Sequence, residues 1–253
     1  MPRQCIFCPN PADSKEHLWP DWALKSIGRH RPIVRRTHGV PGKEFQSPIS
    51  VKHVCRECNS GWMSALESDI KSYVQPMLHG VALALTKEQQ AAICAWAMKT
   101  AMVLQATTET KHRFYTRAER ESLRLNSAIP KRSLVWLGRF STSDGLLCDG
   151  INIFLNVDKV PKAANGCVTT IIMGQFLVQV LTIHYPPQYD SETVRIHCGN
   201  GPWDKALIGI CPHAPRVEWP PLHTFTEKGP MSFVWILNRW QLGVRQTNPV
   251  SSE

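Results

Sequence analysis

No stretch of the 253-residue sequence approaches the roughly 18 consecutive uncharged apolar residues that a membrane-spanning helix needs. The N-terminus also lacks the charged leader and apolar run of a secretory signal, because it reads MPRQCIFCPNPADSKEH and enters a cysteine pair at once. These two absences argue against an integral membrane protein and against an exported one. We therefore expect a soluble, cytoplasmic chain with no membrane partner.

The cysteines do not have the pattern of a disulfide framework. There are nine of them, an odd number, and four form two CxxC pairs. The other five stand singly, at Cys94, Cys148, Cys167, Cys198 and Cys211. This usage fits a reducing cytosol better than a secreted, disulfide-bonded domain.

The sequence has no internal repeat and no glycine-rich phosphate-binding fingerprint. The segment CGNGPW at 198–203 has the spacing of neither common fingerprint, so we interpret it as a turn. The C-terminal histidines have no second ligand at metal-binding spacing, which favours packing or surface roles for His184, His197, His213 and His223.

Acidic residues are scarce relative to basic ones. The chain has 20 Asp and Glu against 29 Lys and Arg, a net charge of +9 and a pI near 9.2, which favours a polyanionic partner. The first 60 residues hold ten basic and five acidic side chains. The densest basic group predicts a phosphate-contacting arm, and the alternative is a solvated loop. This group consists of Arg29, Arg31, Arg35 and Arg36.

The periodicity of apolar residues predicts an α+β protein in three segments. Residues 1–78 are rich in Cys, His and Arg, residues 79–128 are helical, and residues 129–253 are a strand-rich α+β region of unknown role. Capping boxes at Thr86 with Gln89, and at Thr116 with Glu119, begin two helices. Strands are predicted at 133–140, 151–157, 168–173, 176–185 and 232–238, with a hairpin at Gly174.

Two CxxC pairs, Cys5 with Cys8 and Cys55 with Cys58, are separated by 46 residues. Two such pairs complete the tetrahedral four-thiolate shell that Zn²⁺ prefers. A redox role needs only one pair in a strand-to-helix setting, so it is the less economical alternative. We expect a structural zinc site made by these four cysteines.

A zinc closed by four thiolates has no open position for water, so any hydrolytic chemistry must come from other residues. Glu16 and His17 lie between the pairs, and Asn59 directly follows the second. Glu16 and Asn59 offer hard oxygen ligands for Mg²⁺ or Mn²⁺, and His17 is suited to deprotonate a water molecule.

The segments CIFC, EHLWP and CRECNSGW resemble the HNH endonuclease family, the ββα-metal nucleases, in their zinc-bearing four-cysteine form. The resemblance covers about a third of the chain. It implies a ββα-metal, treble-clef-like module over residues 1–78 that hydrolyses phosphodiester bonds in DNA. It also implies that His17 is the general base, that Glu16 and Asn59 hold the catalytic divalent cation, and that the cysteines hold structural zinc. RNA is the less favoured substrate.

The sequence departs from that family at two positions. Glu16 stands where Asp is commoner, and Ser50 stands where the family has its middle Asn. The missing Asn leaves a second hypothesis open, a zinc-stabilised nucleic-acid-binding or assembly protein with weak or no catalysis. The oligomeric state cannot be inferred from these patterns.

After Asn59 the pattern predicts a helix. Its apolar stripe is expected to pack on the two strands of the module, at Trp62, Leu66, Ile70 and Val74. Glu67 is expected to form a surface ion pair with Lys71, one turn further on, in preference to an extra metal contact.

Overall fold

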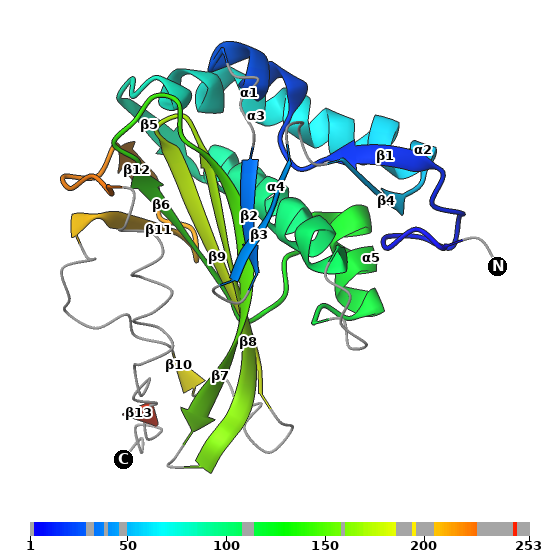
Figure 1. Ribbon diagram of the computed structural model, residues 1–253. Helices are drawn as coiled ribbons and strands as arrows, with labels where there is room; N and C mark the ends of the chain where they lie inside the picture. Colours follow the sequence, from blue (N-terminus) through cyan, green and yellow to red (C-terminus); the bar gives the residue numbers. More distant parts are fainter. Residues whose placement is uncertain are drawn as a thin grey trace.

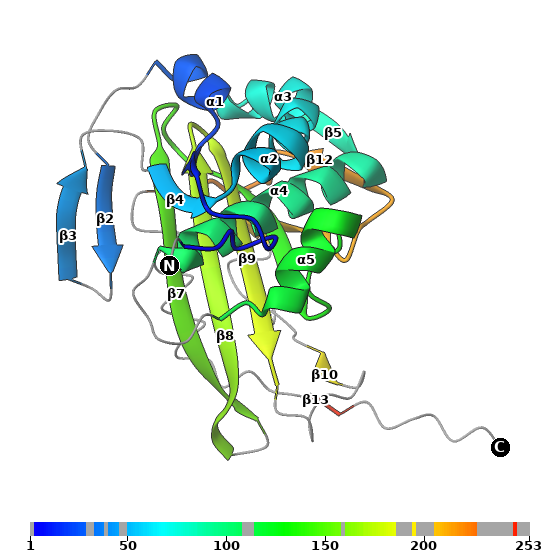
Figure 2. The same ribbon diagram turned by 90° about the vertical axis from the view of Figure 1, so that its right-hand side faces the viewer.

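The computed structural model of the chain has a mixed α+β architecture, in which helices lie on one face of an antiparallel sheet (Figures 1 and 2). The structure describes residues 3–28, 33–37, 40–45, 50–107, 114–157, 160–185, 194–195, 205–226 and 245–246. No helix in these ranges is both long and apolar enough to cross a bilayer. The α+β class predicted from the sequence is confirmed.

The central sheet has five antiparallel strands in the spatial order β11, β6, β9, β8, β7. Their bounds are Ser133–Arg139 (β6), Leu146–Val157 (β7), Val160–Met173 (β8), Phe176–His184 (β9) and Leu207–Cys211 (β11). Four of the predicted strands lie in this sheet. The strand predicted at 232–238 lies outside the described residues.

Helix α4 (Lys87–Ala106) lies across one face of the sheet and also packs against helix α3 (Ser64–Leu78) (Figure 2). It begins at the predicted capping box, where Thr86 and Gln89 exchange backbone and side-chain hydrogen bonds of 2.9 and 3.3 Å. From Ile93 onward every residue of the helix is buried, because the sheet and the N-terminal helices enclose it. This explains why its sequence is apolar around most of its circumference.

Strand β9 is buried on both faces. Val178 and Val180 belong to the core that includes α4, whereas Leu177 and Leu181 belong to a second cluster with Phe225. Alternate side chains of a strand point to opposite faces, so a strand covered on both sides reads as a continuous apolar run.

The N-terminal part combines a strand pair with three successive helical elements. Strand β1 (Ser14–His17) pairs antiparallel with β4 (Ser50–Val54), and β4 leads into α2 (Arg56–Cys58), the π-helical turn η1 (Asn59–Met63) and α3 (Ser64–Leu78). The predicted helix and its apolar stripe are confirmed, although α3 packs chiefly on α1 (Asp21–Ser26) and α4 instead of the strand pair.

The remaining elements are a helix and three short strand pairs. They are α5 (Arg117–Asn126), β2 (Ile33–Thr37) with β3 (Val40–Phe45), β5 (Leu83–Thr86) with β12 (Arg216–Trp219), and β10 (Val194–Arg195) with β13 (Arg245–Gln246). Helix α5 begins at the predicted capping box of Thr116 and Glu119.

One buried cluster contains residues from all three sequence segments, among them Cys5, Ile70, Trp96 and Val180. A polar contact reinforces it, since Arg124 Nε of α5 donates a 3.1 Å hydrogen bond to the Phe7 carbonyl oxygen. The N-terminal cysteine region therefore shares its core with the sheet.

The turn between β8 and β9 abuts the C-terminal end of α3. Gly174 has φ +57°, and a Cβ atom there would collide with the Leu78 carbonyl oxygen. We expect Gly174→Ala to lower the free energy of unfolding by about 2–3 kcal/mol, through left-handed strain plus that collision. Gly28 is the matched control, because its φ is +65° but a Cβ atom added there would meet nothing within 4 Å. Gly28→Ala should cost only about 1 kcal/mol in urea unfolding, and equal losses would contradict the role of packing at Gly174.

Candidate functional site: a four-cysteine cluster beside a polar cavity

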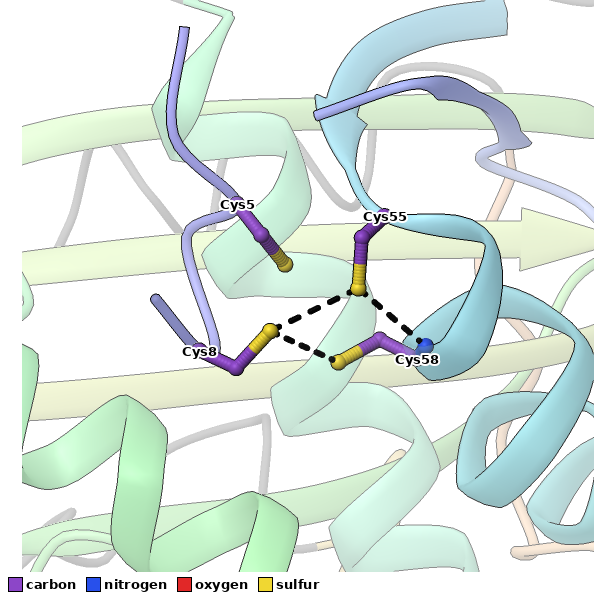
Figure 3. Close-up of side chains that lie close together, drawn as sticks. All are labelled: Cys5, Cys8, Cys55 and Cys58. Carbon is purple, nitrogen blue, oxygen red and sulfur yellow. Dashed lines mark hydrogen bonds between the residues drawn. The ribbon is translucent and has the colours of Figure 1, made fainter. Parts of the chain in front are cut away.

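The thiols of Cys5, Cys8, Cys55 and Cys58 converge on one point (Figure 3). Their sulfur atoms all lie within 4.8 Å of one another, and Cys8 Sγ is 3.4 Å from Cys55 Sγ and 3.6 Å from Cys58 Sγ. A tetrahedron with Zn–S bonds of about 2.3 Å has S–S edges of about 3.8 Å. The four buried thiols therefore fit a zinc ion in number, chemistry and spacing.

Each pair has a local backbone structure that supports thiolates. The backbone N–H of Phe7 donates to Cys5 Sγ at 3.5 Å, and that of Cys58 donates to Cys55 Sγ at 3.4 Å. A hydrogen bond from Cys58 lowers the pKa of the Cys5 thiol to about 4. Burial acts in the opposite direction but has the smaller effect. Burial raises the pKa of the Cys8 thiol to about 11, and the hydrogen bond with Cys5 raises the pKa of Cys58, so of these three thiols Cys5 alone is favoured as the thiolate, the form that binds metal.

Several contacts outside the sulfurs join the two pairs. Ile6 N donates to the His53 carbonyl oxygen at 2.9 Å, and Asn10 Nδ2 donates to Glu57 Oε2 at 2.8 Å. The rings of Phe7 and Trp62 meet edge to face at 5.1 Å. These bonds hold the first CxxC loop against β4 and the start of the helix.

Asn59 lies one residue after the cluster and faces β1. Its Nδ2 donates to Ser14 Oγ at 2.8 Å and to the Lys15 carbonyl oxygen at 2.9 Å. Both amide hydrogens are therefore used within the protein, and Oδ1 is left as the free donor atom for a cation. The four cysteines fix this arrangement, because Cys58 and Asn59 are neighbours in the chain.

A cavity of about 340 Å³ lies between β1 and the start of α3, and its lining includes Glu16, His17, Asn59 and Glu67. The three residues predicted to be catalytic thus line one cavity. The cavity lining provides two carboxylates and an amide, and Mg²⁺ and Mn²⁺ prefer such oxygen ligands.

His17 is partly exposed, with 43% of its side chain accessible, whereas Glu16 is buried. Its Nδ1 lies 3.6 Å from Asp21 Oδ1, in the first turn of α1. Ser50, which replaces the expected middle Asn, is the partner of His17 in the strand register. The sequence did not indicate that Asp21 contacts His17, because an acidic residue at the start of a helix is already explained by its interaction with the helix dipole.

Glu16 is only 4% exposed and is bonded to a lysine that no sequence pattern singled out. Lys99 Nζ lies 2.8 Å from Glu16 Oε1 and 2.8 Å from Glu67 Oε1. Burial raises the pKa of the Glu16 carboxyl, and attraction to the Lys99 ammonium opposes that rise. The expected pairing of Glu67 with Lys71 is wrong, since Glu67 faces inward and pairs with Lys99 instead.

The signal for Lys99 was present in the sequence. It is the one charged residue between Ile93 and Ala106, in the most apolar helix of the chain. A buried lysine needs a carboxylate partner, but sequence alone does not say which of the 20 acidic residues supplies it.

The other predicted residues are placed as follows. Arg29 and Arg31 lie outside the described residues, and Arg35 and Arg36 belong to β2. His184 bonds Glu119 Oε1 at 2.8 Å and stacks on Phe114, and His213 Nδ1 bonds the Ile210 carbonyl oxygen. Packing roles are confirmed for these two histidines, His223 is exposed, and His197 and Cys198 are not among the described residues.

Replacing one ligand of the cluster should remove zinc and destabilise the protein. We expect Cys55→Ser to fall from one zinc per chain to nearly none by elemental analysis. Its melting temperature should fall by about 10 °C or more, because a structural zinc site contributes several kcal/mol to folding. Cys211→Ser is the control, since Cys211 is half-buried and lies outside the cluster. A Cys55→Ser protein with wild-type melting and activity would refute the structural role.

Comparison of the chain with protein-family models, with curated proteins and with solved structures finds no match.

Proposed function

We propose that this chain is a metal-dependent endonuclease of the HNH type, which hydrolyses phosphodiester bonds in DNA. The observation that carries the proposal is the shared cavity: Glu16 and His17 from β1 and Asn59 from the start of the helix line it together, directly beside the four-cysteine cluster. Strands β1 and β4 pair antiparallel and the helical elements α2, η1 and α3 follow β4, which supports the ββα-metal resemblance, although α1 and the β2–β3 pair stand between the two strands in the chain.

His17 is the general base of the proposed reaction. Asp21 stands on its Nδ1 side, so Nε2 is the nitrogen that takes a proton from the attacking water. Because the ring borders the open cavity and is partly exposed, it can reach a water molecule beside a bound phosphate.

Glu16, Asn59 and Glu67 would hold the divalent cation through carboxylate and amide oxygens. Such a cation, when bound, neutralises charge on the scissile phosphate and stabilises the leaving oxygen. Hydrogen bonds to Ser14 and Lys15 orient the Asn59 amide, and Lys99 fixes one oxygen of Glu16. The chain's own contribution is therefore to hold these oxygen donors at fixed positions.

A second candidate, a DNA-binding protein without catalysis, is favoured by one observation. Ser50 is opposite His17 where the family has Asn, and a serine hydroxyl is shorter than the amide it replaces. This candidate predicts salt-sensitive DNA binding with no metal-dependent nicking, so the two functions separate in one assay.

We expect the zinc-loaded wild type to nick supercoiled plasmid with Mg²⁺ or Mn²⁺ and not with EDTA. His17→Ala should reduce the nicking rate at least about 100-fold while DNA binding is retained, because general-base catalysis contributes that much. Asn59→Ala should also lose activity, in a way that added Mn²⁺ partly restores. His223→Ala is the control, an exposed histidine that does not line the cavity. Identical behaviour of all four proteins with every metal would overturn the catalytic assignment.

The arginines of β2 should contribute to binding of the DNA backbone. Arg35→Ala/Arg36→Ala should weaken binding and reduce the slope of log K against log salt concentration by about 2, since each phosphate contact contributes about 0.9. Fluorescence anisotropy with a labelled duplex at several salt concentrations measures this slope. Arg216→Ala, an exposed arginine bonded to Glu218 on β12, should leave the slope unchanged. An unchanged slope in the double variant would remove β2 from the DNA interface.

A further inference from the structure

The buried cation between Glu16 and Glu67 has a consequence for metal binding in the cavity. Lys99 is fully buried in the middle of α4, and its Nζ bonds one oxygen of each carboxylate at 2.8 Å. The two Oε1 atoms therefore lie no more than 5.6 Å apart, twice the 2.8 Å distance to the shared nitrogen. A divalent cation that bridged them would bring them to within about 4.5 Å, with the cation close to the present position of the ammonium.

The ammonium remains charged in this position. Burial disfavours the cation, but two carboxylate oxygens at 2.8 Å stabilise the ammonium. The chain thus places a permanent positive charge between two of the oxygen donors that line the cavity.

We propose that Lys99 acts as a resident counter-cation that holds the affinity of this cavity for divalent metal low. Its single charge leaves the two carboxylates with a net charge of −1 instead of −2, and it occupies their Oε1 atoms. Of the proposed ligand atoms, the Oε2 atoms and Asn59 Oδ1 then remain for a metal ion. The phosphate of a bound nucleic acid supplies the missing negative charge, so metal binds well only together with substrate. Lys99 is a positioning residue in this scheme and contacts no reacting atom.

The inference deepens the proposed nuclease function, because it concerns the same cavity, but its test does not depend on nicking. Binding of Mn²⁺ alone to the zinc-loaded 253-residue chain is measured by the loss of the free-Mn²⁺ EPR signal. Lys99→Met keeps the length of the side chain and removes its charge. It should bind Mn²⁺ at least about tenfold more tightly than wild type, since the carboxylates regain their full charge at short range.

Two further variants locate the effect. Adding Glu67→Gln to Lys99→Met should remove most of the gain, because one of the two carboxylates is lost. Lys87→Met is the matched control, an exposed lysine at the first position of the same helix. It should bind Mn²⁺ as wild type does.

Removal of a buried charge can prevent folding, so circular dichroism accompanies each titration. Lys99→Gln is the second neutral variant, whose amide still donates a hydrogen bond to a carboxylate, and it should also bind Mn²⁺ more tightly. A folded neutral variant that binds Mn²⁺ no more tightly than wild type would overturn the proposal. Tighter Mn²⁺ binding in a protein that never nicks DNA would support this role of Lys99 and contradict the nuclease function.

Discussion

The four thiols that meet at one point hold Asn59 against β1 in the candidate site. They join the first loop of the chain to the start of a helix 47 residues later, across a strand pair too short to be stable in isolation. Because Asn59 follows Cys58 directly and Ser14 pairs with Val54 on the neighbouring strand, closing the cluster sets the distance between the amide and β1. A metal ion bound by the four thiols would add stability that so small a module cannot gain from buried apolar area alone.

Ion pairs form a second connection between the N-terminal module and the rest of the fold. Lys99 belongs to α4, which lies on the central sheet, while Glu16 and Glu67 belong to β1 and α3. Removing Lys99 would leave the buried Glu16 carboxylate without its partner, at a cost of about 3–5 kcal/mol. The sheet and α4 therefore have a defined role for the site: they carry the cation that orders its carboxylates.

The sequence predicted the elements whose signals are local. Both capping boxes, the buried stripe of α3 and the Gly174 hairpin depend on neighbours within a few residues, and each is present. The cysteine cluster was predictable over a long distance only because two CxxC pairs in one chain have few physical uses other than metal binding.

The partners of Glu67 and His17 were not predictable in the same way. Lys71, the cation one helical turn from Glu67 in the sequence, is not its partner, because packing on α4 decides which face of α3 points to the interior. Asp21 comes within 3.6 Å of His17 through the bend between β1 and α1, which no periodicity encodes. Contacts between elements depend on tertiary packing, so local patterns in the sequence do not predict them.

The central claim is that Glu16, His17 and Asn59 form one metal-dependent site beside a separate structural zinc. Anomalous X-ray diffraction from crystals of the zinc-loaded protein with a DNA duplex and Mn²⁺, recorded at the zinc and manganese edges, tests it most directly. We expect a zinc peak among the four cysteines and a manganese peak in the cavity, beside Glu16 and Asn59 and in contact with a phosphate near His17. Manganese at the cysteines, or bound DNA with no manganese in the cavity, would contradict it.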